Sequence, residues 1–337
     1  MRVYRLPKTD GIDDLTMVEE ATPRPGRGQV LVRMRAASLN YRDLMVATGR
    51  FSQGDAPNAL IPMSDGAGEI AEIGSDVDRF AVGDRVAPIF MQAWLGGELK
   101  ARYNVTALGG NVDGVLSEYR VLDQQGLVGI PEHLSFEEAA TLPCAALTAW
   151  NTLFGERVLK AGETVLALGT GGVSIFAVQF AQLAGAQAII TSSSDAKLER
   201  AKDLGAAYGV NYAKNPEWQN DVLALTDGEG VDVVVEVGGA GTLQRSAQAA
   251  RFGGSIGLIG SSFAGGEVNP APIMRRGLRL RGVRIGSREM FEAMNRAVAA
   301  HGLKPVIDRV FPFAEAKAAY RHLESQKHLG KVVITIE

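Results

Sequence analysis

The stretch from residue 164 to residue 197 most constrains how this chain can fold. It begins with a short apolar run at 165–168, which has the length and the flanking residues of a buried strand. A glycine-rich turn follows at 169–172, and apolar residues then recur at helical spacing over 173–184. A second apolar run occupies 188–190. The pattern predicts a strand–helix–strand unit whose glycines lie in the strand-to-helix turn.

A turn of this kind is suited to bind a pyrophosphate. Gly169 permits the tight turn and Gly171 lets a phosphate approach the backbone, while the helix N-terminus offers free N–H groups and a positive dipole end. Ser174 stands where the third glycine of the G-x-G-x-x-G pattern would stand, and it is small enough for close packing of helix on strand. The alternative is a tight turn without a ligand. The predicted dinucleotide contacts are Gly169, Thr170, Gly171, Gly172 and Val173.

The end of the second strand bears on the choice between NADPH and NADH. An NAD site usually carries Asp or Glu about 20 residues after the glycines, bonded to the ribose 2′-OH. Here that place holds Ser192, followed by Ser193 and Ser194, whose hydroxyls can donate to a 2′-phosphate that Lys197 can neutralise. Asp195 complicates this reading, although its simpler role is as an acid in the first turn of a helix capped by Ser194. We favour NADP(H), with NAD(H) as the alternative.

Composition narrows the class of protein further. The 337 residues make two domains the natural expectation, and the net charge of −3 gives no electrostatic case for nucleic acid or an anionic membrane. No apolar run is long enough to span a bilayer, and the first residues lack an apolar signal core, so we expect a cytoplasmic protein. Cys144 is the only cysteine, which excludes intrachain disulfides and clusters of cysteine metal ligands.

The chain in order predicts a β-rich domain followed by a sheet-and-helix domain. Residues 1–125 contain short alternating strands separated by turn signals, with an irregular glycine-rich loop at 91–114. Residues 126–287 alternate strands and helices, which argues for a doubly wound parallel sheet. The strand candidates lie at 164–168, 187–191, 208–212, 231–237, 254–259 and 279–285. Residues 288–337 are too few to form a domain alone, so we expect them to return to the first one.

Several strings in this order resemble those of the medium-chain dehydrogenase/reductase superfamily. They are SLNYRD, SDGAGEIAEIGSDV, GDRV, GVLSEYRVL, AATLPCAALTAW, LALGTGGVS, EVGG and HLGKVVI, and they extend over essentially the whole chain. The resemblance implies an α/β protein with a GroES-like β-barrel catalytic domain and a Rossmann doubly wound parallel sheet. It also implies a homodimer, in which the edge strand within 279–285 pairs across a two-fold axis.

The zinc-binding motifs of that superfamily are changed in this chain. Its zinc alcohol dehydrogenases hold catalytic zinc with Cys, His-Glu and Cys motifs, and the matching residues here are Asn40, Ser64 with Asp65, and Cys144. Only Cys144 could still be a ligand, whereas a catalytic zinc site needs three. The four-cysteine structural zinc lobe is also absent. The resemblance is therefore closest to the zinc-free, quinone oxidoreductase-like branch; we expect no metal and read Cys144 as a small buried residue.

The same branch suggests residues near the nicotinamide. It carries an asparagine in an NYxD-like motif, here Asn40, whose amide could donate to a substrate oxygen or hold the cofactor ribose; the alternative is that it fixes its own loop. Tyr41 could supply a phenol or simply pack, and Asp43 is expected to order the loop. A tyrosine that many quinone and enoyl reductases of this branch carry is replaced by Phe51, which has no proton to give. Water, the ribose hydroxyl or another residue must then supply the proton.

Further cofactor contacts are implied at the ends of later strands. Tyr212 in GVNYAK matches a tyrosine that often helps to hold the 2′-phosphate in this branch, and its alternative role is packing. Gly238, Gly260 and Ser261 follow two strands at their carboxyl ends, where ligands bind in open α/β sheets. Lys331 in HLGKVVI occupies a position where the family turns back to the cofactor, although an isolated lysine is usually solvated.

Together these features predict hydride transfer from NADPH to a quinone, an enone or a related electron-poor carbonyl acceptor. Asn40 would polarise the acceptor oxygen, and the apolar residues Phe51, Phe90 and Trp94 would shape the pocket. A conjugated acceptor suits a site without a metal because conjugation spreads the developing negative charge. Two alternatives remain: an alcohol dehydrogenase or aldehyde reductase that uses no zinc, and an NADPH-binding redox sensor that turns over no acceptor. The substrate itself is not fixed by the fold.

Overall fold

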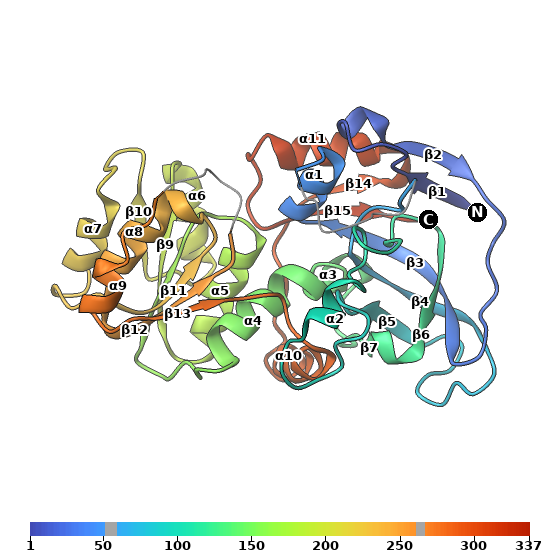
Figure 1. Ribbon diagram of the computed structural model, residues 1–337, viewed down its shortest axis with the longest axis horizontal. Helices are drawn as coiled ribbons and strands as arrows, with labels where there is room; N and C mark the ends of the chain where they lie inside the picture. Colours follow the sequence, from blue (N-terminus) through green and yellow to red (C-terminus); the bar gives the residue numbers. More distant parts are fainter. Residues whose placement is uncertain (51–58, 261–266) are drawn as a thin grey trace. The chain divides into compact units, whose positions relative to one another are not determined.

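The computed structural model describes residues 1–50, 59–260 and 267–337. The chain divides into two compact units, which Figure 1 draws in the colours of the sequence. The first unit combines Met1–Leu147 with Gly286–Glu337, and the second unit is Thr148–Ile285.

The second unit is built on a six-stranded parallel sheet with the strand order β10-β9-β8-β11-β12-β13. The strands are β8 (Thr164–Ala167), β9 (Gln187–Ser192), β10 (Tyr208–Asn211), β11 (Val231–Glu236), β12 (Ala250–Leu258) and β13 (Arg279–Gly282). The order reverses between β8 and β11, which is the arrangement of a doubly wound sheet. The predicted doubly wound parallel sheet is therefore confirmed, with a strand at each candidate position.

Helices connect these strands and cover the sheet. They are α4 (Leu147–Phe154), α5 (Gly172–Leu183), α6 (Asp195–Asp203), α7 (Trp218–Ala224), α8 (Ala240–Ala249) and α9 (Ala271–Arg275). Val165, Leu166 and Ala167 of β8 are all fully buried. Interior strands of a parallel sheet read as continuous apolar runs because helices bury both of their faces. This is why the apolar run at 165–168 identified the centre of the sheet.

Strand β13 forms one edge of this sheet and pairs only with β12 among the described strands. Leu280 in β13 is partly exposed, and Phe252 in β12 is largely exposed. An exposed edge strand with apolar side chains is a surface on which another strand can pair. The homodimer implied by the family resemblance stays a prediction.

The first unit contains a seven-stranded sheet with the path β14-β15-β3-β4-β5-β7, and β6 pairs with β3 off this path. Its strands are β3 (Gln29–Leu39), β4 (Asp65–Ile73), β5 (Arg85–Pro88), β6 (Tyr119–Asp123), β7 (Leu127–Gly129), β14 (Ile307–Pro312) and β15 (Lys331–Thr335). A separate antiparallel pair consists of β1 (Arg2–Arg5) and β2 (Thr16–Glu19). The helical segments are η1 (Ile12–Asp14), α1 (Tyr41–Ala47), α2 (Ala101–Asn104), η2 (Gln124–Gly126), α3 (Phe136–Ala139), η3 (Leu142–Ala146), α10 (Arg288–His301), η4 (Phe313–Glu315) and α11 (Ala316–Glu324).

Strand β3 organises the first unit because it has three partners. Its first half pairs with β6, its second half pairs with β15, and β4 runs along its other edge. Figure 1 shows β15 beside β3. Two register shifts in the β3–β4 pairing, at Leu31/Val32 and Met34/Ala36, mark bulges, which let a strand bend from one partner to the next.

The boundary between the units differs from the one expected from sequence. The sequence analysis placed it at 125/126 and 287/288, whereas the structure places it after Leu147 and after Ile285. The residues after 125 stay in the first unit because α3 packs on β3, β4 and β15. Strand and turn signals locate elements, but they do not show against which sheet a connecting helix packs. In the same way, the loop expected at 91–114 contains a helical turn, α2.

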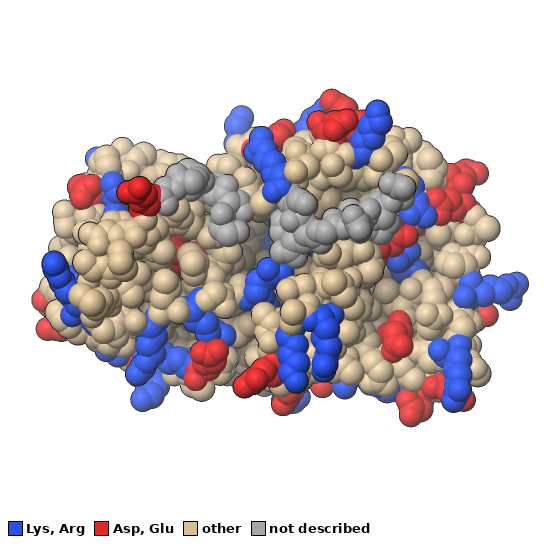
Figure 2. Space-filling model, in the orientation of Figure 1, with Lys and Arg blue, Asp and Glu red and all other residues tan. Residues whose placement is uncertain are grey.

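Basic and acidic side chains are mixed over the surface that Figure 2 shows, in agreement with the small net charge of −3. Among the described residues, no helix is both long enough and apolar enough to cross a membrane. The cytoplasmic location stays a prediction.

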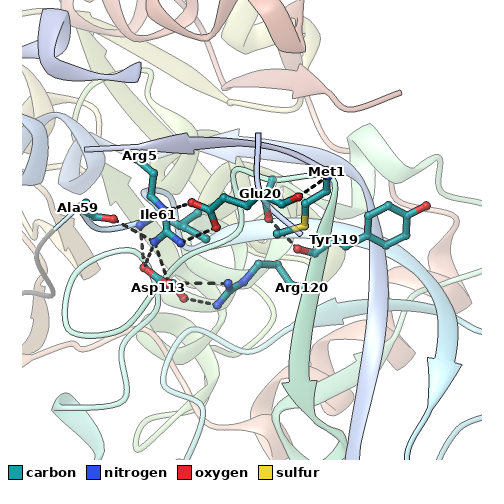
Figure 3. Close-up of polar contacts among 9 residues, drawn as sticks. Met1, Arg5, Glu20, Ala59, Ile61, Asp113, Tyr119 and Arg120 are labelled. Carbon is teal, nitrogen blue, oxygen red and sulfur yellow. Dashed lines mark hydrogen bonds and ion pairs between the residues drawn. The ribbon is translucent and has the colours of Figure 1, made fainter. Parts of the chain in front are cut away.

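An ionic network fastens the β1–β2 pair to the rest of the first unit (Figure 3). Arg5 makes a bidentate ion pair with Glu20, in which Nε donates to Oε1 at 2.8 Å and Nη2 donates to Oε2 at 2.9 Å. Arg5 Nη1 donates to Asp113 Oδ2 at 3.1 Å. Asp113 Oδ1 also accepts from the Ile61 N–H at 2.8 Å, and the Arg120 guanidinium lies on its other side. The hydrogen bond from Arg5 lowers the pKa of Glu20. One aspartate therefore joins three segments that are distant in sequence.

We predict that Asp113→Ala lowers the stability of the first unit by about 1–3 kcal/mol, because it leaves the Ile61 N–H without its acceptor and removes a carboxylate that pairs with Arg5 and Arg120. Asp13→Ala is the matched control, since its partner Arg321 and Asp13 itself are both well exposed and such pairs contribute at most about 1 kcal/mol. The measurement is the urea midpoint of each variant. An equal loss in the two variants would contradict this role for Asp113.

Candidate functional site

The glycine turn of the second unit fits a dinucleotide pyrophosphate. Strand β8 ends at Ala167 and α5 begins at Gly172, so the turn is short. Gly169 has a φ of +69°, which favours glycine, and Gly171 is the N-cap of α5. A methyl group added at either Gly169 or Gly171 would meet no atom within 4 Å. The turn therefore has open space in front of N–H groups that the helix itself leaves unbonded.

Two buried hydroxyls hold this turn in place. Ser174 Oγ donates to the Leu168 carbonyl oxygen at 2.6 Å, so the residue in the place of the third glycine ties α5 to the end of β8. The Gly169 N–H donates to Thr191 Oγ1 at 3.1 Å, which connects the turn to β9. The close packing expected at Ser174 is present, and its hydroxyl adds a bond that a glycine could not make.

The three serines at the carboxyl end of β9, of which Ser192 is the last residue of the strand, make different contacts. Ser192 is buried and its Oγ accepts from the Ser194 N–H at 3.2 Å, whereas Ser193 is exposed. Ser194 Oγ accepts from the Lys197 N–H at 3.4 Å and so caps α6, as expected. Asp195 is exposed, and its carboxylate is paired with Lys214 Nζ at 2.7 Å.

Because Asp195 is paired with Lys214, its carboxylate would repel a 2′-phosphate less strongly. The hydrogen bond from Lys214, and then that from Asn211, lower the pKa of Asp195, so the carboxylate is ionised but neutralised by a neighbour. The Tyr212 N–H donates to the Ser192 carbonyl at 3.1 Å, and the ring is partly exposed. The structure thus brings Ser192, Ser194, Lys197 and Tyr212 to the carboxyl ends of β9 and β10. Whether they bind the phosphate stays a prediction.

A buried carboxylate that the sequence analysis did not single out shapes the turn after β11. Glu236 is fully buried, and its Oε1 accepts from the N–H groups of Gly238 and Gly239 at 2.7 and 3.0 Å and from Thr242 Oγ1 at 2.6 Å. Ser246 Oγ donates to the other oxygen. The signal in the sequence was a single acid at the end of the apolar strand VDVVVE.

Steric packing alone explains why residues 238 and 260 are glycines, without a bound ligand. A methyl group on Gly238 would lie 2.3 Å from Thr242 Oγ1, and one on Gly260 would lie 1.9 Å from the Val237 carbonyl oxygen. Their predicted contact with the cofactor stays a prediction. Ser261 lies outside the described residues, as does Phe51.

In the first unit, the pairing of β3 brings three of the singled-out positions together. Leu39, the last residue of β3, is paired with Val332 of β15, and Ser38 is paired with Asp65 of β4. Asn40 follows directly, so Lys331 and Asp65 flank it from the two neighbouring strands.

The Lys331 ammonium group is buried at the end of β3. The residue is only 3% exposed, and Nζ donates to the Leu39 carbonyl oxygen at 2.5 Å and to Asn40 Oδ1 at 2.6 Å. The alternative of a solvated surface lysine is therefore wrong. Burial lowers the pKa of Lys331, and the negative charge of Asp65 opposes this shift.

The Asn40 amide has a fixed orientation. Lysine can only donate hydrogen bonds, so Oδ1 must face Lys331 and Nδ2 must face away. Nδ2 is buried and makes no hydrogen bond of normal geometry within the described chain, although the amide lies near enough to Asp65 to lower the pKa of that carboxyl. A buried N–H donor without a good partner is rare in folded proteins and calls for a ligand or a water.

Asp65 is fully buried and its two oxygens are both engaged. Oδ1 accepts from Ser64 Oγ at 2.7 Å, and Oδ2 accepts from the Cys144 N–H at 3.0 Å. Burial raises the pKa of Asp65, while the Lys331 charge lowers it. Cys144 lies in η3, a π-helical segment, and is partly exposed, whereas the sequence analysis expected a small buried residue.

The other singled-out residues of this unit serve mainly to pack it. Tyr41 is partly buried against the apolar core. Phe90 is buried beneath the Arg42 guanidinium, and Trp94 is buried and stacked on Tyr103. The predicted catalytic role of Tyr41 and the predicted pocket role of Phe90 and Trp94 stay predictions.

These residues do not fit a catalytic zinc ion. Asn40 Oδ1 is bonded to an ammonium group, and the Ser64 hydroxyl donates its proton to Asp65. Desolvation, and then the charge of Asp65, raise the pKa of the Cys144 thiol, whereas zinc binds the thiolate. Among the described residues, no group of three or more His, Cys, Asp or Glu side chains could hold a metal.

This chain is similar to known proteins in sequence and fold. Residues 26–132 match the family described as alcohol dehydrogenase GroES-like domain, and residues 172–300 match zinc-binding dehydrogenase. A zinc-type alcohol dehydrogenase-like protein of Schizosaccharomyces pombe is 45% identical over 335 residues, covering 97% of this chain and 96% of the relative. A quinone oxidoreductase of Pseudomonas aeruginosa is 31% identical over 323 residues, covering 92% of each. The crystal structure of an NAD-dependent alcohol dehydrogenase matches all of this chain and of its own, with a TM-score of 0.91 at 34% identity.

A glycine turn that fits a dinucleotide, on a doubly wound sheet joined to a GroES-like domain, defines an oxidoreductase that uses a pyridine nucleotide. The chain belongs to the medium-chain dehydrogenase/reductase superfamily. The resemblance inferred from the sequence motifs is confirmed, as is the fold class.

We predict that Gly171→Ala weakens NADPH binding by about 1.5–3 kcal/mol for each phosphate hydrogen bond that the methyl group displaces. The methyl group would meet no protein atom, so the unfolding midpoint should stay nearly unchanged. Gly129→Ala in β7 is the matched control, because that position is equally open. Fluorescence titration measures the affinity, and an unchanged affinity for NADPH would show that the pyrophosphate does not bind at this turn.

The buried carboxyl of Asp43 predicts a pH-dependent stability. Asp43 is 1% exposed, and burial raises its pKa from 3.8 to about 7; Arg42 and Lys331 lower it and Asp65 raises it. Because the folded pKa exceeds the unfolded one, the stability that protonated Asp43 contributes is fully present below 3.8 and is lost as the pH rises toward 7. We predict that Asp43→Asn gains stability relative to wild type over this window. Urea midpoints at several pH values test this, and a pH-independent difference would contradict it.

Proposed function

We propose that this protein is a zinc-independent, NADPH-dependent oxidoreductase that transfers hydride to a quinone, an enone or a related electron-poor carbonyl acceptor. The observation that carries the proposal is the Asn40 amide, whose Oδ1 is held by Lys331 and whose buried Nδ2 lacks a hydrogen bond of normal geometry. When bound, NADP(H) supplies or accepts the hydride. The protein's own contribution is a fixed N–H donor for the acceptor oxygen.

A fixed amide donor supports reduction of a conjugated acceptor. Hydride arrival makes the acceptor oxygen more negative, so a bond from Asn40 Nδ2 strengthens toward the transition state and raises the rate. One neutral donor is a weaker electrophile than a metal ion, and conjugation compensates by spreading the charge. The likeness to the Pseudomonas aeruginosa quinone oxidoreductase also supports this acceptor class.

The choice of NADPH is supported by the carboxyl ends of β9 and β10. Ser192 ends β9 and two further serines and Lys197 follow it, and the acid that could repel a 2′-phosphate, Asp195, is paired with Lys214. The likeness to an NAD-dependent alcohol dehydrogenase keeps NADH as the alternative cofactor.

A second candidate function is favoured by a different observation. The 45% identical relative in Schizosaccharomyces pombe is described as zinc-type alcohol dehydrogenase-like, so an alcohol or aldehyde substrate is the other candidate. The ratio of quinone to aldehyde turnover with the purified enzyme separates the two candidates. A protein that binds NADPH but turns over neither acceptor would be the redox sensor considered above.

We predict that Asn40→Ala lowers the single-turnover rate of hydride transfer by on the order of 10²-fold, the loss typical of one oxyanion donor, while NADPH affinity is retained. Asn220→Ala, on the exposed surface of α7, is the control and should change neither quantity. The paired measurements are the dissociation constants of NADPH and NADH and the hydride-transfer rate to the best acceptor. A weaker cofactor affinity with an unchanged transfer rate would remove Asn40 from the reaction.

A further inference from the structure

Burying the Lys331 ammonium group costs free energy of hydration, so its surroundings must compensate for that loss. An ammonium group loses most of its hydration when it is buried, and the loss is tolerated only with good acceptors and a counter-charge. Lys331 has both, because two oxygens lie within 2.6 Å of Nζ and the buried carboxylate of Asp65 acts on it electrostatically. A lysine that served only to fill the core would be replaced by an apolar side chain at lower cost.

The groups around Lys331 occupy the positions at which the family resemblance implies zinc-binding motifs in the zinc alcohol dehydrogenases. Asn40, Asp65 and Cys144 match the zinc-motif positions; Asn40 is hydrogen-bonded to Lys331, Asp65 acts on it electrostatically, and the Cys144 N–H is hydrogen-bonded to Asp65. We propose that the Lys331 ammonium is the fixed cation of this site, taking the place of the catalytic metal, and that it positions the Asn40 amide for the acceptor oxygen.

Two physical consequences follow for the reaction, and both rest on the proposed function. First, Lys331 holds Oδ1 and so leaves Nδ2 as the end of the amide that can donate. Second, the positive charge of Lys331 offsets the negative charge of Asp65. Without Lys331, the Asp65 carboxylate would repel the negative charge that develops on the acceptor oxygen. Lys331 acts through Asn40 and Asp65 and is a positioning residue. This differs from the cofactor contact that the family resemblance implied.

The first test uses zinc binding and does not depend on activity. Asn40→Cys with Ser64→His restores two ligands beside Cys144, and this double variant is compared with a triple variant that adds Lys331→Met. If the ammonium occupies the cation position, the folded triple variant binds one zinc ion and the double variant binds much less, because removing the charge frees the site. Metal content of dialysed protein is the readout, with circular dichroism as the check on folding. Equal zinc content in the two variants, whether high or absent, would overturn the proposal.

The second test separates positioning from cofactor binding. Lys331→Met keeps an unbranched side chain only one atom shorter and removes its charge, and we expect hydride transfer to fall on the order of 10²-fold with NADPH affinity unchanged. Lys331→Arg keeps a charged donor and should recover part of the rate. Lys202→Met, at an exposed lysine of α6, is the control. Weaker NADPH binding with an unchanged transfer rate would overturn the proposal and make Lys331 a cofactor contact. If the wild-type protein reduces no acceptor, the proposed function fails, and the zinc comparison still decides the role of Lys331.

Discussion

The pairing of β3 with β15 and β4 is the constraint on which the polar site of the first unit depends. The register Leu39↔Val332 brings Lys331 to one side of Asn40, and the register Ser38↔Asp65 brings a carboxylate to the other. A shift of either strand by one residue would turn the charged side chain to the opposite face of the sheet. Backbone hydrogen bonds of the sheet therefore set the distances between charges, and the charges set the orientation of one amide.

Each unit contains a buried ionisable side chain, and the two units stabilise its charge in different ways. In the second unit, Glu236 is surrounded by two backbone N–H groups and two hydroxyls, so its charge is spread over dipoles. In the first unit, Lys331 and Asp65 are balanced by each other as well as by hydrogen bonds. Dipoles suffice where the group only has to hold a turn in shape. A full counter-charge suits a site where the net charge affects a reaction.

Much of the fold could be predicted from the sequence because its signals are local. The apolar runs of the parallel sheet and the glycines after β8 show the second unit directly, and the motif order shows the family. The contact between Asn40 and Lys331 could not be predicted in this way, since the two residues are distant in the chain and meet only through strand register. For the same reason the sequence read Cys144 as buried and placed the boundary before α3: exposure and domain membership depend on packing between elements.

The order of the segments along the chain also affects how the protein is made. All residues of the second unit, Thr148–Ile285, are synthesised between the two segments of the first unit. During translation, the nucleotide unit can complete its sheet while β3 still lacks β15. Until Lys331 arrives, Asn40 and the buried Asp65 have no cation beside them, and the edge of β3 is unpaired. A nascent chain thus acquires its dinucleotide turn first, and the Asn40 amide is oriented only after β15 has been made.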